Sequence, residues 1–345
     1  MEEYNSDHEV DGEEEELYEH YKFVADPGQE VIRIDKFLID RLPNTSRNKI
    51  QIAAKNGNVF VNGLRVKQNY KVKPGDSVAL VLPYPVRELK LIPQDIPLDI
   101  VFEDDQLIIV NKPANMVVHP GYGNYKDTLV NALVYHFDNL PMRIKDYFGR
   151  PGLVHRIDKH TTGLLVVAKT EHALTHLAQQ FYERTTDRRY VALVWGDVKE
   201  DGTVIGHIGR SLKNRKVMSV FPDADHGKHA VTHYKVIERF GLVTLIECKL
   251  ETGRTHQIRI HMKSIGHPLF HDLEYGGNEL VKGTRSATYA KFIDNCFDLI
   301  PGQALHAKTL GFTHPQTGKF FTFDSPLPIG FQQLVEKWRK FVDPN

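Results

Sequence analysis

A polar stretch at 152–163, followed directly by an apolar run at 164–168, constrains this chain more than any other part of the sequence. The run is LLVVA, and a short apolar run of this kind predicts a fully buried strand. The glycines and threonines before it predict a loop that leads into that strand. Rigid scaffolds present reactive side chains on such loops, so we expect functional residues here.

Asp158 is the only carboxylate between residues 150 and 169. The basic and imidazole side chains of the same interval are Arg150, His155, Arg156, Lys159, His160 and Lys169. Nearby cations favour the charged form of a carboxylate, so we expect Asp158 to be an ionised nucleophile or ion-pair partner and not a protonated general acid. A structural salt bridge in a loop gives the same pattern, and the residues alone leave both interpretations open.

Charge is distributed unevenly along the 345 residues. Residues 1–22 contain ten acidic residues and one basic residue, which leaves 43 basic against 34 acidic residues in the rest, a formal charge of +9. A basic body predicts a polyanionic partner. We expect residues 1–24 to be a disordered acidic tail, either a solubilising segment or an intramolecular mimic of nucleic acid. The length exceeds that of a typical single domain, so at least two folded units are expected.

The cysteine content and the absence of long apolar runs favour a cytoplasmic protein. Cys248 and Cys296 are the only cysteines and lack metal-ligand spacing, which fits a reducing compartment and argues against a disulfide framework. The acidic N-terminus does not have the pattern of a signal peptide. The longest apolar runs are too short to span a membrane, so we expect a soluble protein with no membrane partner.

Residues 31–82 have the pattern of a small unit of helices and short strands. Apolar spacing predicts one helix near 32–39 and a second, capped within 44–47, that carries Ile50, Ile52 and Ala53. The whole segment contains ten basic residues against three acidic ones. That excess predicts contact with a phosphate backbone.

This unit resembles an S4 RNA-binding domain. The similarity rests on four motifs in order: RIDKFL at 33–38, SR at 46–47, GNVFVNG at 57–63 and KPGD at 73–76. The resemblance implies that exposed basic side chains contact RNA, namely Arg33, Lys36, Arg47, Lys49, Lys55 and Lys67. Each of them singly is also compatible with an ordinary solvated side chain.

The rest of the chain predicts a larger domain. Four prolines within 83–97 predict an extended linker. Residues 98–330 combine strand patterns with helical ones, including a helix capped by Thr170, and apolar spacing in 331–345 predicts a C-terminal helix packed on this domain. The expected fold class is α+β, in which a small RNA-binding domain precedes a mixed, largely antiparallel domain with a central cleft.

A second dense stretch at 250–262 (LETGRTHQIRIHM) supplies further polar side chains for a site around Asp158. A carboxylate nucleophile in an RNA-binding protein must reach a nucleotide that has been extruded from its stack. In this interpretation Arg156 fills the vacated space and Tyr190 stacks on the extruded base. Arg259 is a suitable partner to keep the carboxylate ionised.

These motifs are similar to those of the RluA family of pseudouridine synthases. The similarity rests on NKPA at 111–114, GLVHRID at 152–158 and GRTHQIR at 253–259, and it extends over roughly 98–330. Ile157 stands where leucine is usual in the family and keeps the apolar character. The resemblance implies that uridine is isomerised to pseudouridine: the N1–C1′ bond breaks and a C5–C1′ bond forms. Such a reaction has no net redox or hydrolytic step, so neither a cofactor nor a metal is expected.

The resemblance also implies roles for individual residues. Asp158 corresponds to the essential aspartate, Tyr190 to the tyrosine beside the target base and a candidate to take the C5 proton, and Arg259 to the arginine paired with the aspartate. The implied substrate-binding residues are Arg156, which replaces the flipped base, together with His155, Arg254, His256 and Leu305. Whether the aspartate attacks the ribose C1′ or acts otherwise stays open.

The implied substrate is large-subunit (23S) ribosomal RNA, free or in an assembling large ribosomal subunit, with no obligatory protein partner. A pseudouridine synthase for transfer RNA and a noncatalytic S4-type ribosome-assembly factor are the alternatives. A metal-dependent hydrolase is a weaker one, because His226, His229 and His233 form no known metal-binding pattern and neither HExxH nor CxxC occurs.

Overall fold

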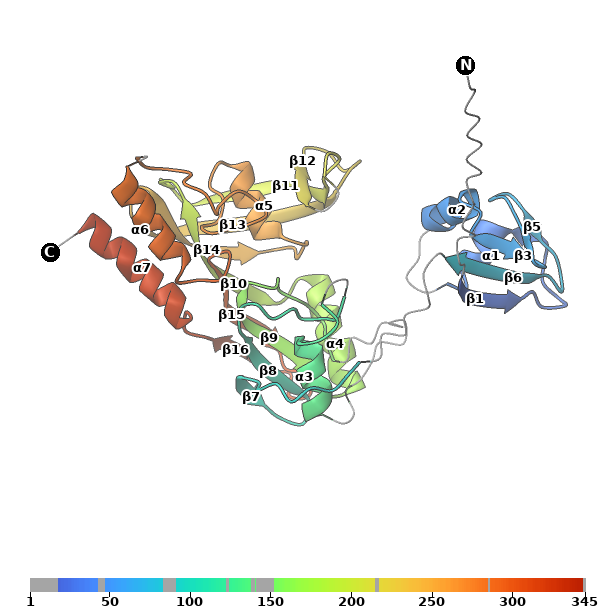
Figure 1. The fold of residues 1–345 in the computed structure, drawn as a ribbon. Helices are drawn as coiled ribbons and strands as arrows, with labels where there is room; N and C mark the ends of the chain where they lie inside the picture. The colour runs from blue at the N-terminus through green and yellow to red at the C-terminus, as the bar shows by residue number, and fades with distance from the viewer. Residues whose placement is uncertain are drawn as a thin grey trace, which may run out of the picture. The chain divides into compact units, whose positions relative to one another are not determined.

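The computed structural model describes residues 18–42, 47–82, 91–121, 124–137, 140, 152–214, 217–284 and 286–343. They form two compact units, one before residue 90 and one from residue 91 onward (Figure 1). We call these unit 1 and unit 2 and describe each by itself.

Unit 1 combines two small sheets with two helices. Its larger sheet has the order β1 (Tyr18–Val24), β6 (Ser77–Leu82), β3 (Val59–Val61) and β4 (Leu64–Arg65), and β2 (Ile32–Arg33) pairs with β5 (Lys71–Val72). Helices α1 (Ile34–Ile39) and α2 (Arg47–Lys55) complete the unit. Its core contains Ile34, Phe37, Leu38, Ile50, Val59, Val61 and Val78.

One expectation for unit 1 is wrong in detail. Residues 18–24 belong to the predicted disordered tail but form β1, which pairs with β6 in antiparallel fashion. Tyr21 and Phe23 of this strand pack against the core. The free energy gained by burying their apolar surface offsets the entropy lost when the strand becomes ordered. In α2, Ile50 and Ala54 are buried and Ile52 is half exposed.

Unit 2 is built on one mixed sheet. Along the sheet the order is β12 (Met218–Phe221), β11 (Gly202–Arg210), β13 (Lys228–Arg239), β14 (Val243–Leu250), β10 (Asp187–Trp195), β15 (Leu305–Thr313), β9 (Thr162–Ala168), β8 (Leu107–Lys112) and β7 (Ile100–Glu103), with β16 (Phe320–Asp324) paired to β15. Among the described strands the pairs are antiparallel except for the short contact of β15 with β9. The predicted α+β class with a largely antiparallel sheet is confirmed.

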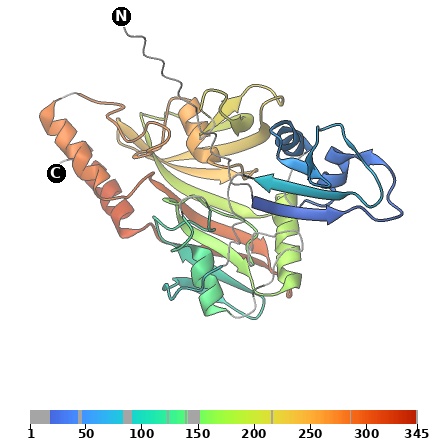
Figure 2. The same cartoon turned by 45° about the vertical axis from the view of Figure 1, so that its right-hand side comes forward.

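Helices cover both faces of this sheet. Successive side chains of a strand point to opposite faces, and the strands carry apolar residues on both. On β10, Val191, Leu193 and Trp195 pack with α6 (Ala287–Phe297) and α7 (Ile329–Val342), which lie side by side (Figures 1 and 2). The same face holds α4 (Glu171–Glu183), whose N-cap is Thr170 as predicted. On the other face, Tyr190 and Ala192 share a core with α3 (Leu129–His136) and α5 (Gln257–Ser264).

The second half of the predicted proline linker belongs to unit 2. Residues 83–90 lie outside the described part, but 91–97 follow α3 closely. The Gln94 backbone N–H donates to the Asn131 carbonyl oxygen at 3.0 Å, and the Asn131 side chain donates to the Ile92 carbonyl oxygen at 2.8 Å. Leu91 also packs against the core. The prolines extend this segment, but its side chains fix it to the domain.

Candidate active site

The loop that carries Asp158 is fixed at both ends by glycines in conformations that other residues rarely adopt. Gly152 has φ +66°, and a Cβ there would lie 2.3 Å from the Ala168 carbonyl oxygen. Gly163 has φ +110°, and a Cβ there would lie 2.3 Å from the Ala307 carbonyl oxygen. A side chain at either position would collide with the neighbouring backbone. The loop therefore approaches β9 and β15 more closely than other residues would allow.

His155 holds this loop from within the protein. The Val166 backbone N–H of β9 donates to His155 Nε2 at 3.0 Å, and the imidazole stacks on Phe181 of α4 with 4.5 Å between ring centroids. Burial, with a smaller contribution from the charge of Arg188, lowers the pKa of His155 to about 3, so the ring is neutral. Its Nε2 and one face of the ring are taken by these internal partners, and its predicted contact with substrate stays a prediction.

Asp158 and Arg259 are 101 residues apart in the sequence and meet in the structure. Arg259 Nη1, on α5, donates to Asp158 Oδ2 at 3.1 Å. The Asp158 side chain is 20% exposed, so the carboxylate is reachable from solvent, whereas the Arg259 side chain is only 4% exposed. The arginine that the sequence names as the partner of Asp158 is therefore in direct contact with it.

Arg259 is itself held by two carboxylates that the sequence analysis missed. Its Nε and Nη2 donate to Asp272 Oδ2 and Oδ1 at 2.7 and 2.8 Å, and Nη2 also donates to Glu274 Oε2 at 2.6 Å. Burial alone would lower the pKa of Arg259, but its bonds to the carboxylates raise that pKa above the ordinary value. Asp272 is fully buried, so this bidentate pair fixes the guanidinium that faces Asp158.

His256 provides a second contact with the Asp158 carboxylate. Its Nε2 lies 3.9 Å from Asp158 Oδ1, and its Nδ1 lies 2.8 Å from the Tyr275 hydroxyl. That hydroxyl accepts a hydrogen bond from the Met218 N–H at 3.0 Å, so its proton is free to be donated to Nδ1. A proton donated to Nδ1 leaves the imidazole proton on Nε2, whereas Glu274 Oε2, 3.7 Å from Nδ1, favours the tautomer protonated at Nδ1. Burial lowers the pKa of His256, and the negative charge of Asp158 opposes that shift only in part. The lowered pKa favours the neutral ring.

Lys112 is a buried cation behind the Asp158 loop. Its ammonium donates to the carbonyl oxygens of Pro113, Met116 and Lys159 at 2.6, 2.8 and 3.1 Å. Burial lowers its pKa to about 7, and the negative charge of Asp158 opposes that shift. The lysine therefore ties the end of β8 to the residue that follows Asp158. The NKPA motif contains it, but the sequence alone suggested no role.

Of the other predicted site residues, Tyr190 and Leu305 are buried and Arg156 is exposed. Tyr190 and Leu305 lie in the same core cluster, and Tyr190 follows a β-bulge in the pairing of β10 with β15. Arg156 is exposed and forms no hydrogen bond or ion pair with any residue that the structure describes. Arg254 donates from Nε to the His229 carbonyl oxygen at 3.1 Å. Burial raises the pKa of Tyr190, so its phenol is protonated at neutral pH.

The sequence around Asp158, Tyr190, His256 and Arg259 is similar to that of known proteins. A family model described as RNA pseudouridylate synthase matches residues 106–264, and one described as S4 domain matches 32–78. An uncharacterized RNA pseudouridine synthase of Bacillus subtilis is 46% identical over 92% of this chain and 97% of its own length. The chain belongs to the RNA pseudouridine synthase family.

Other relatives of this pseudouridine synthase carry more specific names. A protein of Zymomonas mobilis named ribosomal large subunit pseudouridine synthase D is 45% identical over 88% of this chain and 93% of its own length. Among solved structures, human RNA pseudouridylate synthase domain containing 4 superimposes with a TM-score of 0.53 at 23% identity, covering 70% of this chain and 92% of that one. At that identity the likeness shows the fold of unit 2.

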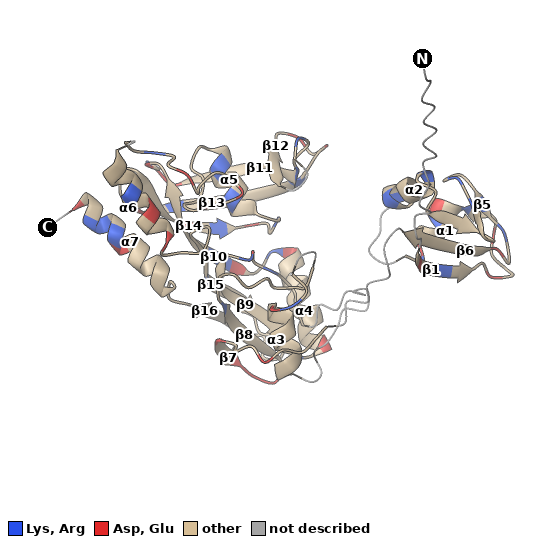
Figure 3. Ribbon diagram, viewed as in Figure 1, with Lys and Arg blue, Asp and Glu red and all other residues tan. Residues whose placement is uncertain are grey.

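In the S4 domain of this pseudouridine synthase, two of the predicted RNA-binding arginines, Arg33 of β2 and Arg47 of α2, bind the carboxylate of Asp35 on α1. Arg33 donates to Asp35 through Nε and Nη2, both at 3.1 Å, and Arg47 Nε donates to the same carboxylate at 2.9 Å. Asp35 is fully buried, whereas the two arginine side chains are 41% and 51% exposed. The predicted Lys36, Lys49, Lys55 and Lys67 are exposed, and Figure 3 shows the basic residues along α2.

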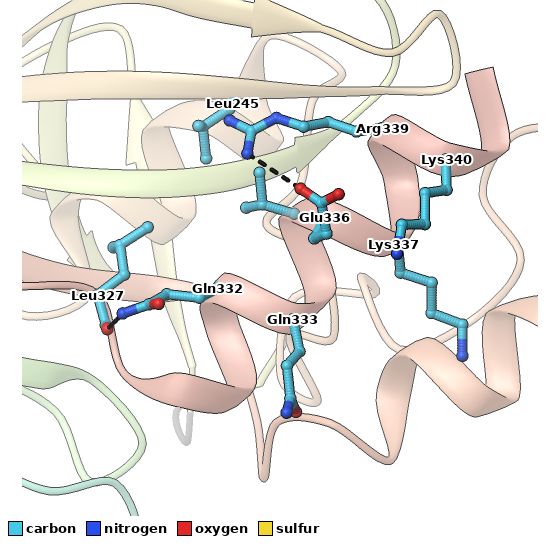
Figure 4. Close-up of a pocket in the computed structure, with 9 residues that line it drawn as sticks. Leu245, Leu327, Gln332, Gln333, Glu336, Lys337, Arg339 and Lys340 are labelled. Atoms are coloured by element: carbon cyan, nitrogen blue, oxygen red, sulfur yellow. Dashed lines mark hydrogen bonds and ion pairs between the residues drawn. The ribbon is translucent and has the colours of Figure 1, made fainter. Parts of the chain in front are cut away.

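The described part of the enzyme contains no group of three His, Cys, Asp or Glu side chains arranged to hold a metal ion. None of its described helices is long and apolar enough to cross a bilayer. A groove of about 620 Å³ runs along α7 and is lined by Leu245, Leu327, Gln332, Val335, Glu336 and Arg339 (Figure 4). It contains none of the predicted catalytic or RNA-binding residues.

Proposed function

We propose that this pseudouridine synthase modifies specific uridines of large-subunit ribosomal RNA and that Asp158 is its catalytic carboxylate. The observation that supports the carboxylate is its contact with Arg259 in a site that remains open to solvent. The name and similarity of the Zymomonas mobilis relative support the substrate, as does the basic S4 domain.

An ionised Asp158 suits the chemistry of the isomerisation. The N1–C1′ bond of uridine breaks, the uracil turns within the site, a C5–C1′ bond forms and the C5 hydrogen leaves as a proton. Attack by the carboxylate on C1′ and electrostatic stabilisation of positive charge at C1′ both require the unprotonated form. Arg259 donates to one carboxylate oxygen and holds it in place, and His256 Nε2 lies 3.9 Å from the other oxygen.

Tyr190 and Arg156 then receive complementary roles. We assign to Tyr190, which is 8% exposed and shares a core cluster with Leu305, the stacking on the extruded base that the family resemblance implies. Proton abstraction from C5 by Tyr190 would first require loss of the phenol proton, which the raised pKa opposes. The exposed Arg156 fills the place of the extruded base in the RNA. The reaction has no net redox or hydrolytic step, so we propose that it uses neither a cofactor nor a metal, in the cytoplasm where the RNA is made.

The deciding experiment maps pseudouridines in the ribosomal RNA of cells that lack this protein. Loss of modification at specific large-subunit sites, restored by the wild type and not by Asp158→Ala, would support both parts of the proposal. An unchanged map would refute the ribosomal substrate, and transfer RNA would be mapped next. Restoration by Asp158→Ala would refute the catalytic role of Asp158. Rescue of a growth or assembly defect by the same variant would favour the noncatalytic assembly factor.

A further inference from the structure

Asp35 is a fully buried carboxylate in the strongly basic unit 1. Residues 31–82 contain ten basic residues against three acidic ones, and Asp35 is 0% exposed. A negative charge in a unit that attracts phosphate opposes that attraction, and an isolated buried charge is costly. The side chains around Asp35 must therefore offset its charge.

Hydrogen bonds from three side chains occupy this carboxylate. Arg33 donates from Nε to Oδ1 and from Nη2 to Oδ2, both at 3.1 Å. Arg47 Nε and Gln51 Nε2 donate to the same Oδ2 at 2.9 and 2.8 Å. Burial raises the pKa of Asp35, but the bonds from Arg33, Gln51 and Arg47 outweigh burial and hold that pKa below its usual range. The carboxylate is therefore ionised.

The two arginines come from different elements and meet at one oxygen atom. Arg33 is the last residue of β2, Arg47 is the first residue of α2, and Asp35 lies on α1. Because Arg33 Nη2 and Arg47 Nε both bond Oδ2, the two guanidinium groups converge on that atom. Side chains ordered in this way before a ligand arrives lose less conformational entropy when it binds.

Both guanidinium groups are also open to solvent. The side chains of Arg33 and Arg47 are 41% and 51% exposed. Within the described residues, no hydrogen bond engages Nη1 of Arg33 or either Nη atom of Arg47. Two guanidinium charges against one carboxylate leave the cluster positive. It can therefore donate several further hydrogen bonds to an anion.

We propose that Asp35 is a positioning residue that holds Arg33 and Arg47 as a clamp for one phosphodiester group of the RNA. This inference rests on the proposed function, in which the S4 domain contacts the substrate RNA. Planar guanidinium donors match the oxygens of a phosphate, and Asp35 itself does not touch the RNA. The clamp holds the RNA backbone and reads no base.

The charge of Asp35 and its positioning effect predict opposite results for Asp35→Asn. Loss of a negative charge makes unit 1 more positive, so attraction between charges alone predicts tighter RNA binding. Loss of the carboxylate also places an amide NH₂ among the arginine donors and releases them, so the clamp predicts weaker binding. Asp40→Asn is the matched control, because Asp40 is the exposed C-cap residue of the same helix and has no ion pair with a described residue.

The test uses the full-length enzyme and large-subunit ribosomal RNA from cells that lack it. The RNA carries tritium at uridine C5, because forming the C5–C1′ bond releases that hydrogen. Affinity is measured across a range of salt concentrations, and KM and kcat are measured from tritium release. Hydrogen exchange in residues 18–82 reports whether unit 1 stays folded. The variants are Asp35→Asn, Asp40→Asn, Arg33→Lys, Arg47→Lys, Arg33→Gln, Arg47→Gln and the last two combined.

Asp35→Asn should weaken RNA binding about tenfold and raise KM with kcat unchanged, as for loss of a charge-assisted hydrogen bond, whereas Asp40→Asn should bind as tightly as the wild type or more tightly. Arg33→Lys and Arg47→Lys keep the charge and lose the planar fork, so each should also weaken binding. Each single glutamine variant should lower the slope of log affinity against log salt by about 0.7–0.9, the value for one phosphate, and the double variant should lower it no further.

Three outcomes would overturn the proposal. In the first, Asp35→Asn stays folded and binds RNA as tightly as Asp40→Asn. In the second, Asp35→Asn unfolds unit 1 and both lysine variants keep the wild-type affinity. In the third, the double glutamine variant loses twice the slope of either single variant, which would mean two separate phosphate contacts.

Failure of the proposed function has a different signature. If the wild type releases no tritium from this RNA, the ribosomal substrate is wrong. The clamp is then judged by the affinities and salt slopes of the variants, which need no turnover.

Discussion

The contact between Arg259 and Asp272 provides the sharpest test of how the site is held together. Asp272 accepts four hydrogen bonds: two from Arg259 at 2.7 and 2.8 Å, and two from the backbone N–H groups of Glu274 and Tyr275 at 3.0 and 3.1 Å. In Asp272→Asn the amide oxygen can replace Oδ1 and keep three of these bonds. The amide NH₂ then faces the Nε–H of Arg259. Both groups are donors, so one charge-assisted hydrogen bond is lost and replaced by repulsion between two N–H groups.

The expected cost follows from these contacts. A hydrogen bond to a charged group contributes about 1.5–3 kcal/mol, and breaking a buried ion pair costs about 3–5 kcal/mol because the other charge stays buried. Asp272→Asn should therefore lower the free energy of unfolding of unit 2 by about 3–5 kcal/mol. Turnover should fall by about tenfold or more, since Arg259 no longer holds Asp158 in one place.

Urea unfolding followed by tryptophan fluorescence measures this change in unit 2 alone. The chain has two tryptophans, Trp195 and Trp338, and both are fully buried in unit 2. Glu274→Gln is the matched control: it binds the same guanidinium, but its side chain is 45% exposed, so it should cost only about 0–1 kcal/mol. A loss below 1 kcal/mol in Asp272→Asn, or equal losses in the two variants, would refute the reasoning.

Four further predictions concern the catalytic carboxylate, the stacking residue, the pH dependence and the S4 surface. Asp158→Asn should abolish tritium release while the unfolding transition and RNA affinity stay close to wild type; retained turnover contradicts the assignment. Tyr190→Leu should weaken RNA binding by about 1–3 kcal/mol and Tyr190→Phe should not, whereas equal losses argue against stacking. Burial lowers the pKa of His155 to about 3 and of His261 and His306 to about 4, below the 6.5 of an unperturbed histidine. The unfolded chain therefore takes up more protons below pH 6.5, and unit 2 should lose stability as the pH falls from 6.5 toward 4, by up to ~4 kcal/mol per pH unit for three sites. Urea midpoints that are constant from pH 7 to pH 5 would contradict this. The triple variant Lys36→Gln, Lys55→Gln, Lys67→Gln should reduce the salt slope of RNA binding by about 0.7–0.9 for each lysine that contacts a phosphate, and an unchanged slope removes these lysines from the RNA surface.

The sequence was informative where the structure depends on local pattern. The apolar run at 164–168 predicts the buried strand β9, and Thr170 predicts the start of α4, because both depend on neighbouring residues. The pairing of Asp158 with Arg259 was also predicted, from their chemical types and the resemblance to a family. The structure places the two side chains 3.1 Å apart, and their catalytic roles stay predictions.

The sequence was uninformative where a residue's partner comes from a distant segment. Asp272 is one of 44 acidic residues, and nothing in its own neighbourhood indicates that it binds Arg259. His155 lies in the motif but accepts a hydrogen bond from Val166 and stacks on Phe181, a position that depends on how α4 packs on the sheet. Residues 18–24 were assigned to the tail by composition, whereas their pairing with β6 depends on a strand more than 50 residues later.

The position of β15 has a consequence for how the enzyme is made. This strand, residues 305–313, pairs with β10 on one side and β9 on the other, so it joins two strands that were synthesised well over 100 residues earlier. The sheet beside Asp158, which includes Tyr190, cannot close until synthesis has passed residue 313, in the last eighth of the chain. Contacts so distant in sequence form slowly, whereas unit 1 is complete early and can fold while the ribosome is still at work. A nascent chain would thus have its S4 domain long before it has a site able to change a uridine.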